Sequence, residues 1–274
     1  MADWGKIISR GNVQDRRGSR LAVGGGIGAA VVIATFIFNV LSGGQININD
    51  LLSLVPAESQ SNLTSSDFEG ADQYEVFAST VLGSTNEYWH DQLAKSGQNY
   101  VEPSLVLFRS ATQSGCGLAT SDVGPHYCPQ DQTIYIDETF FVELQQRFQA
   151  KGGDVAEAYV IAHEVGHHIQ NLSGTLEEAQ QNGTQSSAIA IELQADCYAG
   201  AWANSITDTG VFEQNEINEA IDAAAAVGDD RIQQSVNGQV TPETWTHGSS
   251  ADRVKAFTTG YNSGDPSVCS AEIN

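Results

Sequence analysis

The stretch DVAEAYVIAHEVGHHIQ, residues 154–170, decides the fold of this chain. Its apolar residues recur with the spacing of an α-helix, and an acidic pair three residues apart opens it as helix starts often are. On a helix, His163 and His167 lie one above the other because they are four residues apart. Two imidazoles in this arrangement can bind a single zinc ion. The stretch therefore predicts a helix that carries two metal ligands.

Glu164 follows the first of these histidines and completes the pattern His-Glu-x-x-His. Zinc lowers the pKa of a bound water molecule to about 7, and a carboxylate beside the metal can take its proton. The pattern therefore predicts a hydrolase with Glu164 as general base. The competing interpretation is a chance match, in which the histidines are ordinary surface or core residues. A third ligand on another element favours the first interpretation, because catalytic zinc sites use three protein ligands.

A second helix, predicted over residues 187–197, supplies that ligand. Glu192 and Asp196 are four residues apart in this alanine-rich, apolar segment, so they share one face. Carboxylates on such a helix cost free energy unless a positive group meets them. We predict that Glu192 is the third zinc ligand and that Asp196 accepts a hydrogen bond from the outer ring nitrogen of a ligand histidine. The alternative is a solvated helix face.

The two helices together resemble those of the glutamate-type zincins. More closely, the chain resembles a bacterial family of membrane-anchored neutral zinc metallopeptidases, and the resemblance is weakest between about residues 44 and 98. It implies a mostly helical α+β fold: a zincin-like metallopeptidase domain with a small β-sheet, preceded by one N-terminal transmembrane helix. It also implies bound Zn²⁺ and a peptide or protein substrate. The matching segments are residues 15–18, 114–117, 124–129, 132–137, 162–168, 192–197, 228–231, 246–249 and 263–266.

Residues 242–254 look like the histidine-and-arginine segment of membrane-bound glutamate zincins of the prenyl-protein endopeptidase type. By that resemblance, His247 reaches the zinc-bound water or the oxyanion that forms on the scissile carbonyl, and Arg253 orients a carboxylate of the site. A donor aimed at developing charge can lower a barrier by about 3 kcal/mol. The competing interpretation is a surface loop for His247 and an ordinary salt bridge for Arg253.

Residues 21–41 form an uncharged, apolar run, and about 20 such residues span a bilayer core. Five basic residues precede the run and none follows it until Lys95, so the positive-inside rule places residues 1–20 in the cytoplasm. We therefore predict a single-pass cell-membrane protein with an extracytoplasmic catalytic domain. Glycines within the run could also support a homo-oligomer through this helix. The alternatives are a cleaved signal peptide and a buried core helix.

Composition divides the rest of the chain into a tether and a domain. Residues 42–72 are rich in Ser, Asn, Gln and Gly and predict a flexible linker, and residues 73–274 form the metallopeptidase domain. By similarity to zincins, residues 133–136 are our candidate for the edge strand that binds an extended peptide, the alternative being a plain core strand. Within the domain we predict helices over residues 73–96, 138–149 and 213–226, and strands over residues 104–108 and 133–136.

Four cysteines fit an oxidising compartment outside the cytoplasm. Three pairings are possible. We favour Cys116 with Cys128, which closes a local loop, and Cys197 with Cys269, which would attach the C-terminal region to the predicted ligand helix. Free thiols and a structural zinc site formed by the first pair with His126 are the alternatives.

The formal net charge is −22, and the basic patches that nucleic-acid binding requires do not occur, so we expect no nucleic-acid partner. The predicted function is a membrane-anchored, zinc-dependent endopeptidase. One alternative is an inert, zinc-stabilised interaction domain, against which the intact Glu164 argues. Another is a non-peptidase zinc amidohydrolase of the deformylase kind, with Cys116 as third ligand. His90, His126 and His168 receive no role.

Overall fold

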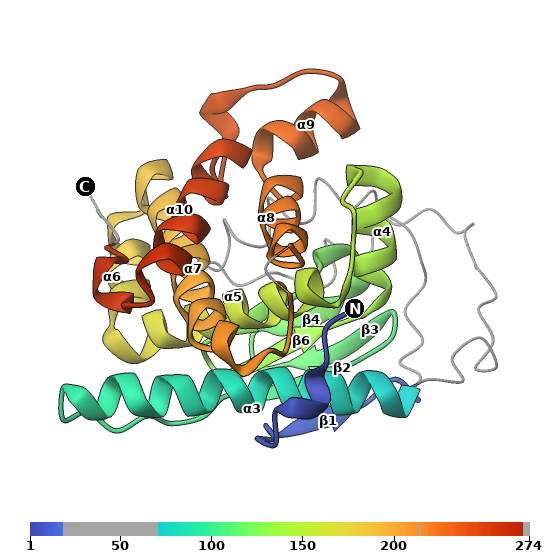
Figure 1. Cartoon of the computed structure of the whole chain (residues 1–274). Coiled ribbons are helices and arrows are strands. Elements are labelled where there is room, and N and C mark those ends of the chain that lie inside the picture. Colours follow the sequence, from blue (N-terminus) through green and yellow to red (C-terminus); the bar gives the residue numbers. More distant parts are fainter. Residues whose placement is uncertain (19–70, 214, 271–274) are drawn as a thin grey trace.

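The computed structural model describes residues 1–18, 71–213 and 215–270. Within these ranges the chain is a mostly helical α+β domain, in which a group of helices packs beside a small sheet (Figure 1). This agrees with the predicted fold class. The helices are α3 (Ala71–Lys95), α4 (Thr139–Phe148), α5 (Asp154–Ser173), α6 (Thr175–Asn182), α7 (Gln185–Ser205), α8 (Ile217–Ala226), α9 (Asp229–Asn237) and α10 (Ser250–Ser263). The strands are β1 (Val13–Asp15), β2 (Ser104–Leu107), β3 (Ala111–Ser114), β4 (Gly117–Thr120), β5 (His126–Cys128) and β6 (Thr133–Ile136).

The helix α5, which carries the HExxH pattern, lies at the centre of the domain. It packs against α7 and α8 and contacts α3 and strand β5. Its apolar side chains are buried along nearly its whole length, which explains why apolar residues outnumber polar ones in this stretch. The helix predicted over residues 213–226 begins only at Ile217, and Val211 and Phe212 before it are buried in the core.

One sheet has the strand order β1-β2-β6-β5, and a separate hairpin consists of β3 and β4. In the sheet, β2 runs parallel to both β1 and β6, and β5 runs antiparallel to β6. Residues 133–136 are therefore not an edge strand, and this prediction is wrong. All four residues of β6 are buried, because Ile134 and Ile136 pack in the main core and Tyr135 packs on the other face with Ala119 of the hairpin. Among the described residues, the edge of this sheet next to α5 belongs to β5.

Residues 1–18 belong to the fold of the domain, which differs from the predicted separate segment over residues 1–20. Val13 pairs with Leu105 in the parallel β1-β2 ladder. Gly11 exchanges hydrogen bonds with Ser79 of α3, at 2.7 and 2.8 Å. The chain crosses α3 at Gly83, where a Cβ atom would lie 2.5 Å from a backbone nitrogen. This crossing therefore requires glycine at that position.

The structure bears only partly on the predicted membrane anchor. Within residues 1–18, 71–213 and 215–270, no helix is both long and apolar enough to cross a bilayer. The predicted span over residues 21–41, and with it the proposed contact between copies, lies outside the described residues. The same is true of the predicted linker over residues 42–72, except that its last two residues begin α3.

Both predicted disulfides are confirmed. Cys116 bonds to Cys128 and ties the β3-β4 hairpin to β5, while Cys197 of α7 bonds to Cys269 near the C-terminus. All four cysteines are thus paired. A cysteine in a disulfide has no thiolate to offer a metal, so Cys116 is not a third ligand of the deformylase kind and the structural zinc alternative also fails.

Candidate metal centre

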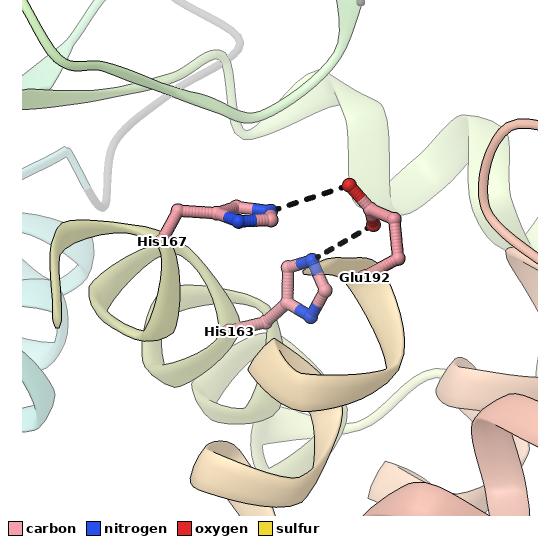
Figure 2. Close-up of side chains that lie close together, drawn as sticks. All are labelled: His163, His167 and Glu192. Carbon is pink, nitrogen blue, oxygen red and sulfur yellow. Dashed lines mark ion pairs between the residues drawn. The ribbon is translucent and has the colours of Figure 1, made fainter. Parts of the chain in front are cut away.

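His163 and His167 on α5 and Glu192 on α7 converge on one point, as the sequence predicts (Figure 2). In Figure 2 each imidazole points at a different oxygen of the carboxylate. Nε2 of His163 lies 3.3 Å from one Glu192 oxygen, and Nε2 of His167 lies 3.4 Å from the other. The two histidines come from successive turns of one helix, so α5 supplies their spacing directly.

Gly166 allows α7 to approach α5 closely enough for this convergence. A Cβ atom at Gly166 would lie 2.9 Å from Cα of Ala195, closer than real Cβ contacts come. Ala195 lies between Glu192 and Asp196 on α7. This contact therefore fixes the position of α7 along α5, and with it the position of the Glu192 carboxylate relative to the two histidines. The sequence pattern alone did not single out this glycine.

The three side chains fit a zinc ion. Nitrogen and oxygen ligands lie about 2.0–2.2 Å from zinc in a tetrahedron, which puts any two of them about 3.3–3.6 Å apart. The two nitrogen–oxygen separations, 3.3 and 3.4 Å, fall in this range but end on different oxygens of Glu192, and one ligand atom from each of the three residues lies within 4.8 Å of the others. Two imidazoles and one carboxylate are also a donor set that zinc prefers, and three protein ligands leave a fourth position for substrate or water.

The electrostatics of the group favour a cation. Burial alone would raise the pKa of Glu192, but His167 and His163 lower it well below its ordinary value, so the carboxylate is ionised. Burial lowers the pKa of His163, but the hydrogen bond and charge of Asp196 outweigh it and raise that pKa to about 9. The position between these side chains therefore attracts positive charge, whether a proton or a metal ion.

His163 is held from behind by an ionic network. Its Nδ1 donates to Asp196 at 2.9 Å, as predicted for that residue. Asp196 also accepts hydrogen bonds from the guanidinium of Arg253 at 2.8 and 2.9 Å and from the hydroxyl of Tyr159 at 2.6 Å. Arg253 is 2% exposed and Asp196 is fully buried. The arginine thus orients a carboxylate of the site, as the resemblance implies.

His167 is held by a neutral chain of amides. Its Nδ1 donates to Gln170 at 2.8 Å, and Gln170 donates to the side chain of Gln194 at 3.0 Å. Gln194 in turn donates to the backbone carbonyl of Cys269 at 2.9 Å. The sequence analysis missed both glutamines. The available signal was the position of Gln170, three residues after His167 on the same helix.

Glu164 lies beside the ligand group and has an oxygen without a partner. The residue is 5% exposed, and its Oε2 atom is buried without a hydrogen bond. Burial raises the pKa of Glu164 above its ordinary value, although the adjacent histidines act in the opposite direction. Buried, unpartnered carboxylate oxygens are rare, and one beside a metal-binding group suits a general base.

His247 also lies in the site, held by Asp229 at the first turn of α9. One oxygen of Asp229 lies 3.1 Å from Nδ1 of His247, and the other accepts the backbone N–H groups of Thr246, His247 and Gly248 at 2.6–2.9 Å. Burial would lower the pKa of His247, but Asp229 and the charge of Glu192 raise it. The imidazole is therefore favoured as a hydrogen-bond donor, and Asp229 was not assigned this role from sequence.

A single cavity of about 170 Å³ joins these groups. His126 and Tyr127 of the edge strand β5 line it beside the metal-binding group. The remaining lining is apolar, with residues from α4, α5, α6, α7, α9 and the segments before β5 and after α8. His168 lies outside the cavity: its ring nitrogens contact the Tyr127 hydroxyl and the Val101 carbonyl at 2.9 and 2.6 Å, so it is a packing residue.

The chain is similar to several bacterial proteins. The chain is 40% identical over 276 residues to the uncharacterized protein YpfJ of Escherichia coli (strain K12), covering 94% of each chain. It is 51% identical over 182 residues to the uncharacterized proteins Mb2605 of Mycobacterium bovis and Rv2575 of Mycobacterium tuberculosis, covering 62% of each chain. No solved structure matches the chain. The family described as putative neutral zinc metallopeptidase matches residues 2–271, which is almost the whole chain. The chain therefore belongs to this family.

Proposed function

We propose that the protein is a zinc-dependent endopeptidase that hydrolyses internal peptide bonds of peptide or protein substrates. One observation supports this most strongly: the buried Glu164 carboxylate, with an oxygen that lacks a partner, lies in the same cavity as the His163, His167 and Glu192 group. A site built only to stabilise a fold needs no such base and normally fills all four metal positions with protein ligands.

The residues have separate roles in the proposed reaction. Zinc bound by the ligand group supplies a Lewis acid that polarises a peptide carbonyl and makes water more acidic. Glu164 takes the proton from the attacking water and passes it to the leaving amine. His247 donates a hydrogen bond to the oxygen of the scissile carbonyl as charge develops there. Asp196 and Arg253 keep His163 in the orientation that ligation requires.

The edge strand β5 is the proposed guide for the substrate backbone. In the described part of the sheet, β6 pairs with one edge of β5, and the cavity lies beside β5. An extended peptide can add to the edge of a sheet through main-chain hydrogen bonds, which carry little sequence information. Substrate selection must then come mostly from side-chain pockets.

The location of the enzyme is a further part of the proposal. Two disulfides favour an oxidising compartment outside the cytoplasm. The uncharged residues 21–41 are long enough to hold the protein at a membrane. Fractionation of cells followed by extraction of membranes with alkaline carbonate tests this. Protein that stays in the membrane pellet supports anchoring, and protein released into the supernatant contradicts it.

The function itself is tested with the whole chain and two variants. Bound zinc and hydrolysis of a casein digest are measured for the unaltered protein, Glu164→Gln and Glu192→Ala. We expect Glu164→Gln to keep zinc and lose hydrolysis at least about a thousandfold, and Glu192→Ala to lose zinc. Full zinc in Glu192→Ala would show that the third ligand lies elsewhere. Zinc without any hydrolysis in the unaltered protein would favour the inert interaction domain.

A further inference from the structure

The cavity beside the metal-binding group is bounded by an apolar wall. Helix α4 contributes Phe140, Leu144 and Phe148 to this wall, Ile232 comes from α9, and Val227 comes from the end of α8. Leu144 and Phe148 are buried, while the other three side chains are partly exposed and pack against them. Apolar side chains that stay partly exposed around a deep cavity leave apolar area for a ligand to cover.

The wall carries no charged group of its own. Every charged or titratable side chain of the cavity lining other than His126 and two tyrosines belongs to the metal-binding group, Glu164, His247 or Arg253. A charged substrate side chain placed against the wall would lose water without gaining a partner, which is costly. An aromatic or branched aliphatic side chain would instead cover apolar area, at about 25 cal/mol per Å².

The wall and the ligand group lie within one cavity, so a side chain on the wall belongs to a residue close to the scissile bond. The volume of about 170 Å³ far exceeds the roughly 10–15 Å³ that one water molecule needs. The two phenylalanine rings also offer faces and edges for an aromatic partner. A second, smaller apolar group, Leu176 and Ile191, lines the cavity from α6 and α7.

We propose that the apolar wall formed by α4, α9 and Val227 selects a large apolar side chain, aromatic or branched aliphatic, in one of the two residues flanking the scissile bond. This inference rests on the proposed peptidase function and names its substrate class. Ile232 is the residue through which the selection is most easily changed. It is a partly exposed apolar residue of α9 that lines the cavity and packs against the buried part of the wall, and residues 233 to 235 after it are polar.

The test uses a peptide library of diverse sequence, with cleavage sites read by mass spectrometry, and pairs of peptides that differ only at the selected position. For the unaltered, zinc-loaded whole chain we expect Phe, Leu, Ile and Met to be enriched at one flanking position. We expect kcat/KM to be about tenfold or more higher for Phe or Leu than for Ala, and higher still than for Glu. Cleavage indifferent to both flanking residues would overturn the inference while leaving the peptidase intact.

Two variants locate the selection on the wall. Ile232→Lys should lower kcat/KM for the Phe and Leu peptides at least about tenfold and narrow or reverse the difference from the Glu peptide. The matched control is Val236→Lys, one turn further along α9 and 38% exposed, which should leave the cleavage profile unchanged. If Ile232→Lys fails to bind zinc, Ile232→Ala serves instead and should shift the preference toward larger aromatic residues.

The outcomes separate the two proposals. An unchanged profile in zinc-loaded Ile232→Lys or Ile232→Ala would show that the wall does not select the substrate. An equal change in Val236→Lys would show that the effect comes from α9 as a whole, and would also contradict the inference. No hydrolysis of any peptide by the zinc-loaded, unaltered chain would instead overturn the proposed function, and this inference with it.

Discussion

His163 and His167 lie one turn apart on α5 and face the same carboxylate, yet the protein supports them in different ways. Behind His163 lies an ionic network, in which Asp196 takes hydrogen bonds from the imidazole and from Arg253. Behind His167 lies a neutral chain, from Gln170 through Gln194 to a backbone carbonyl. We call these the charged support and the neutral support.

The difference has a chemical consequence. A carboxylate behind a ligand imidazole raises its basicity as well as fixing its orientation, whereas an amide oxygen mainly fixes orientation. A buried carboxylate is stable only when it is paired, so the charged support requires Arg253 and the neutral support requires no counter-charge. Zinc affinity should therefore depend more on the charged support, and the effects of substitutions should fall in a definite order.

The largest effect is expected for Asp196→Asn, which keeps the shape of the side chain and removes its charge. Zinc affinity should fall about 10–100-fold, because His163 loses its carboxylate partner. Stability should fall by about 3–5 kcal/mol, because the buried Arg253 loses its hydrogen-bonded counter-charge and keeps only the Glu192 carboxylate, 3.7 Å away. Competition with a chelating dye measures the first effect and urea unfolding the second. Unchanged zinc affinity would remove the distinction between the two supports.

A double substitution separates the two consequences of that change. Asp196→Asn combined with Arg253→Met removes the guanidinium together with the carboxylate that it pairs with. Stability should recover by at least about 1 kcal/mol relative to the single variant, because no buried charge is left alone. Zinc affinity should stay low. Recovery of zinc affinity together with stability would mean that the single variant lost zinc only through unfolding.

A smaller effect is expected for Gln170→Leu, which breaks the neutral support at its first link. His167 loses an orienting hydrogen bond but no charge, so zinc affinity should fall about tenfold or less. The amide of Gln194 also loses a partner, and stability should fall by about 1–2 kcal/mol. The same dye competition applies. A loss larger than that of Asp196→Asn would reverse the order of the two supports.

The far end of the neutral support is tested by removing the disulfide that holds it. Cys197→Ser combined with Cys269→Ser should lower stability by about 2–4 kcal/mol, while zinc affinity falls less than in Gln170→Leu. The matched control is the same double change at Cys116 and Cys128, a bond that joins strands and touches neither support. Equal loss of zinc in both pairs would mean that the effect is not transmitted through Gln194.

The smallest effect on zinc is expected at Glu157, on α5 but outside both supports. Burial raises the pKa of this carboxyl to about 7, above its ordinary value of 4.5. The folded protein therefore holds the proton to higher pH than the unfolded chain, so stability falls as pH rises from about 4.5 to 7. Glu157→Gln should remove this fall, a gain at pH 8 of at most about 3 kcal/mol, with unchanged zinc affinity. Unfolding curves of the unaltered protein and of Glu157→Gln at pH 4.5 and 8 test this prediction.

The metal ligands and Asp196 of the charged support could be predicted from the sequence, and the neutral support could not. Each of the two helices carries a pair with one-turn spacing: His163 and His167 on α5, and Glu192 and Asp196 on α7. The second pair is easily recognised because carboxylates are rare in an apolar helix. Gln170, in contrast, resembles any glutamine on a helix surface. Its burial depends on how α5 meets α7, which the sequence pattern does not specify.

The same limit applies to the sheet. The strand over residues 133–136 was recognised because its residues are apolar or β-branched, but its neighbours depend on contacts distant in sequence. Three-residue strands such as β1 and β5 are too short to show an alternating pattern. Asp229 was not assigned a role for a related reason. Its carboxylate accepts hydrogen bonds from backbone N–H groups of a loop that is distant in sequence, and this contact exists only after folding.

The pairing of β1 with β2 bears on which side of a membrane each part of the chain lies. Two hydrogen-bonded strands lie on the same side of a membrane, so this pairing and the predicted single crossing by residues 21–41 exclude one another. A single crossing of the bilayer between them would leave β1 on one face and its partner on the other. Reporters fused to the two ends of the chain distinguish the two arrangements: agreement about sidedness supports the strand pairing, and disagreement supports the single crossing. Proteolysis between residues 18 and 71 should also leave the N-terminal piece attached, held by its strand and by its hydrogen bonds to Ser79 of α3 and to Val211.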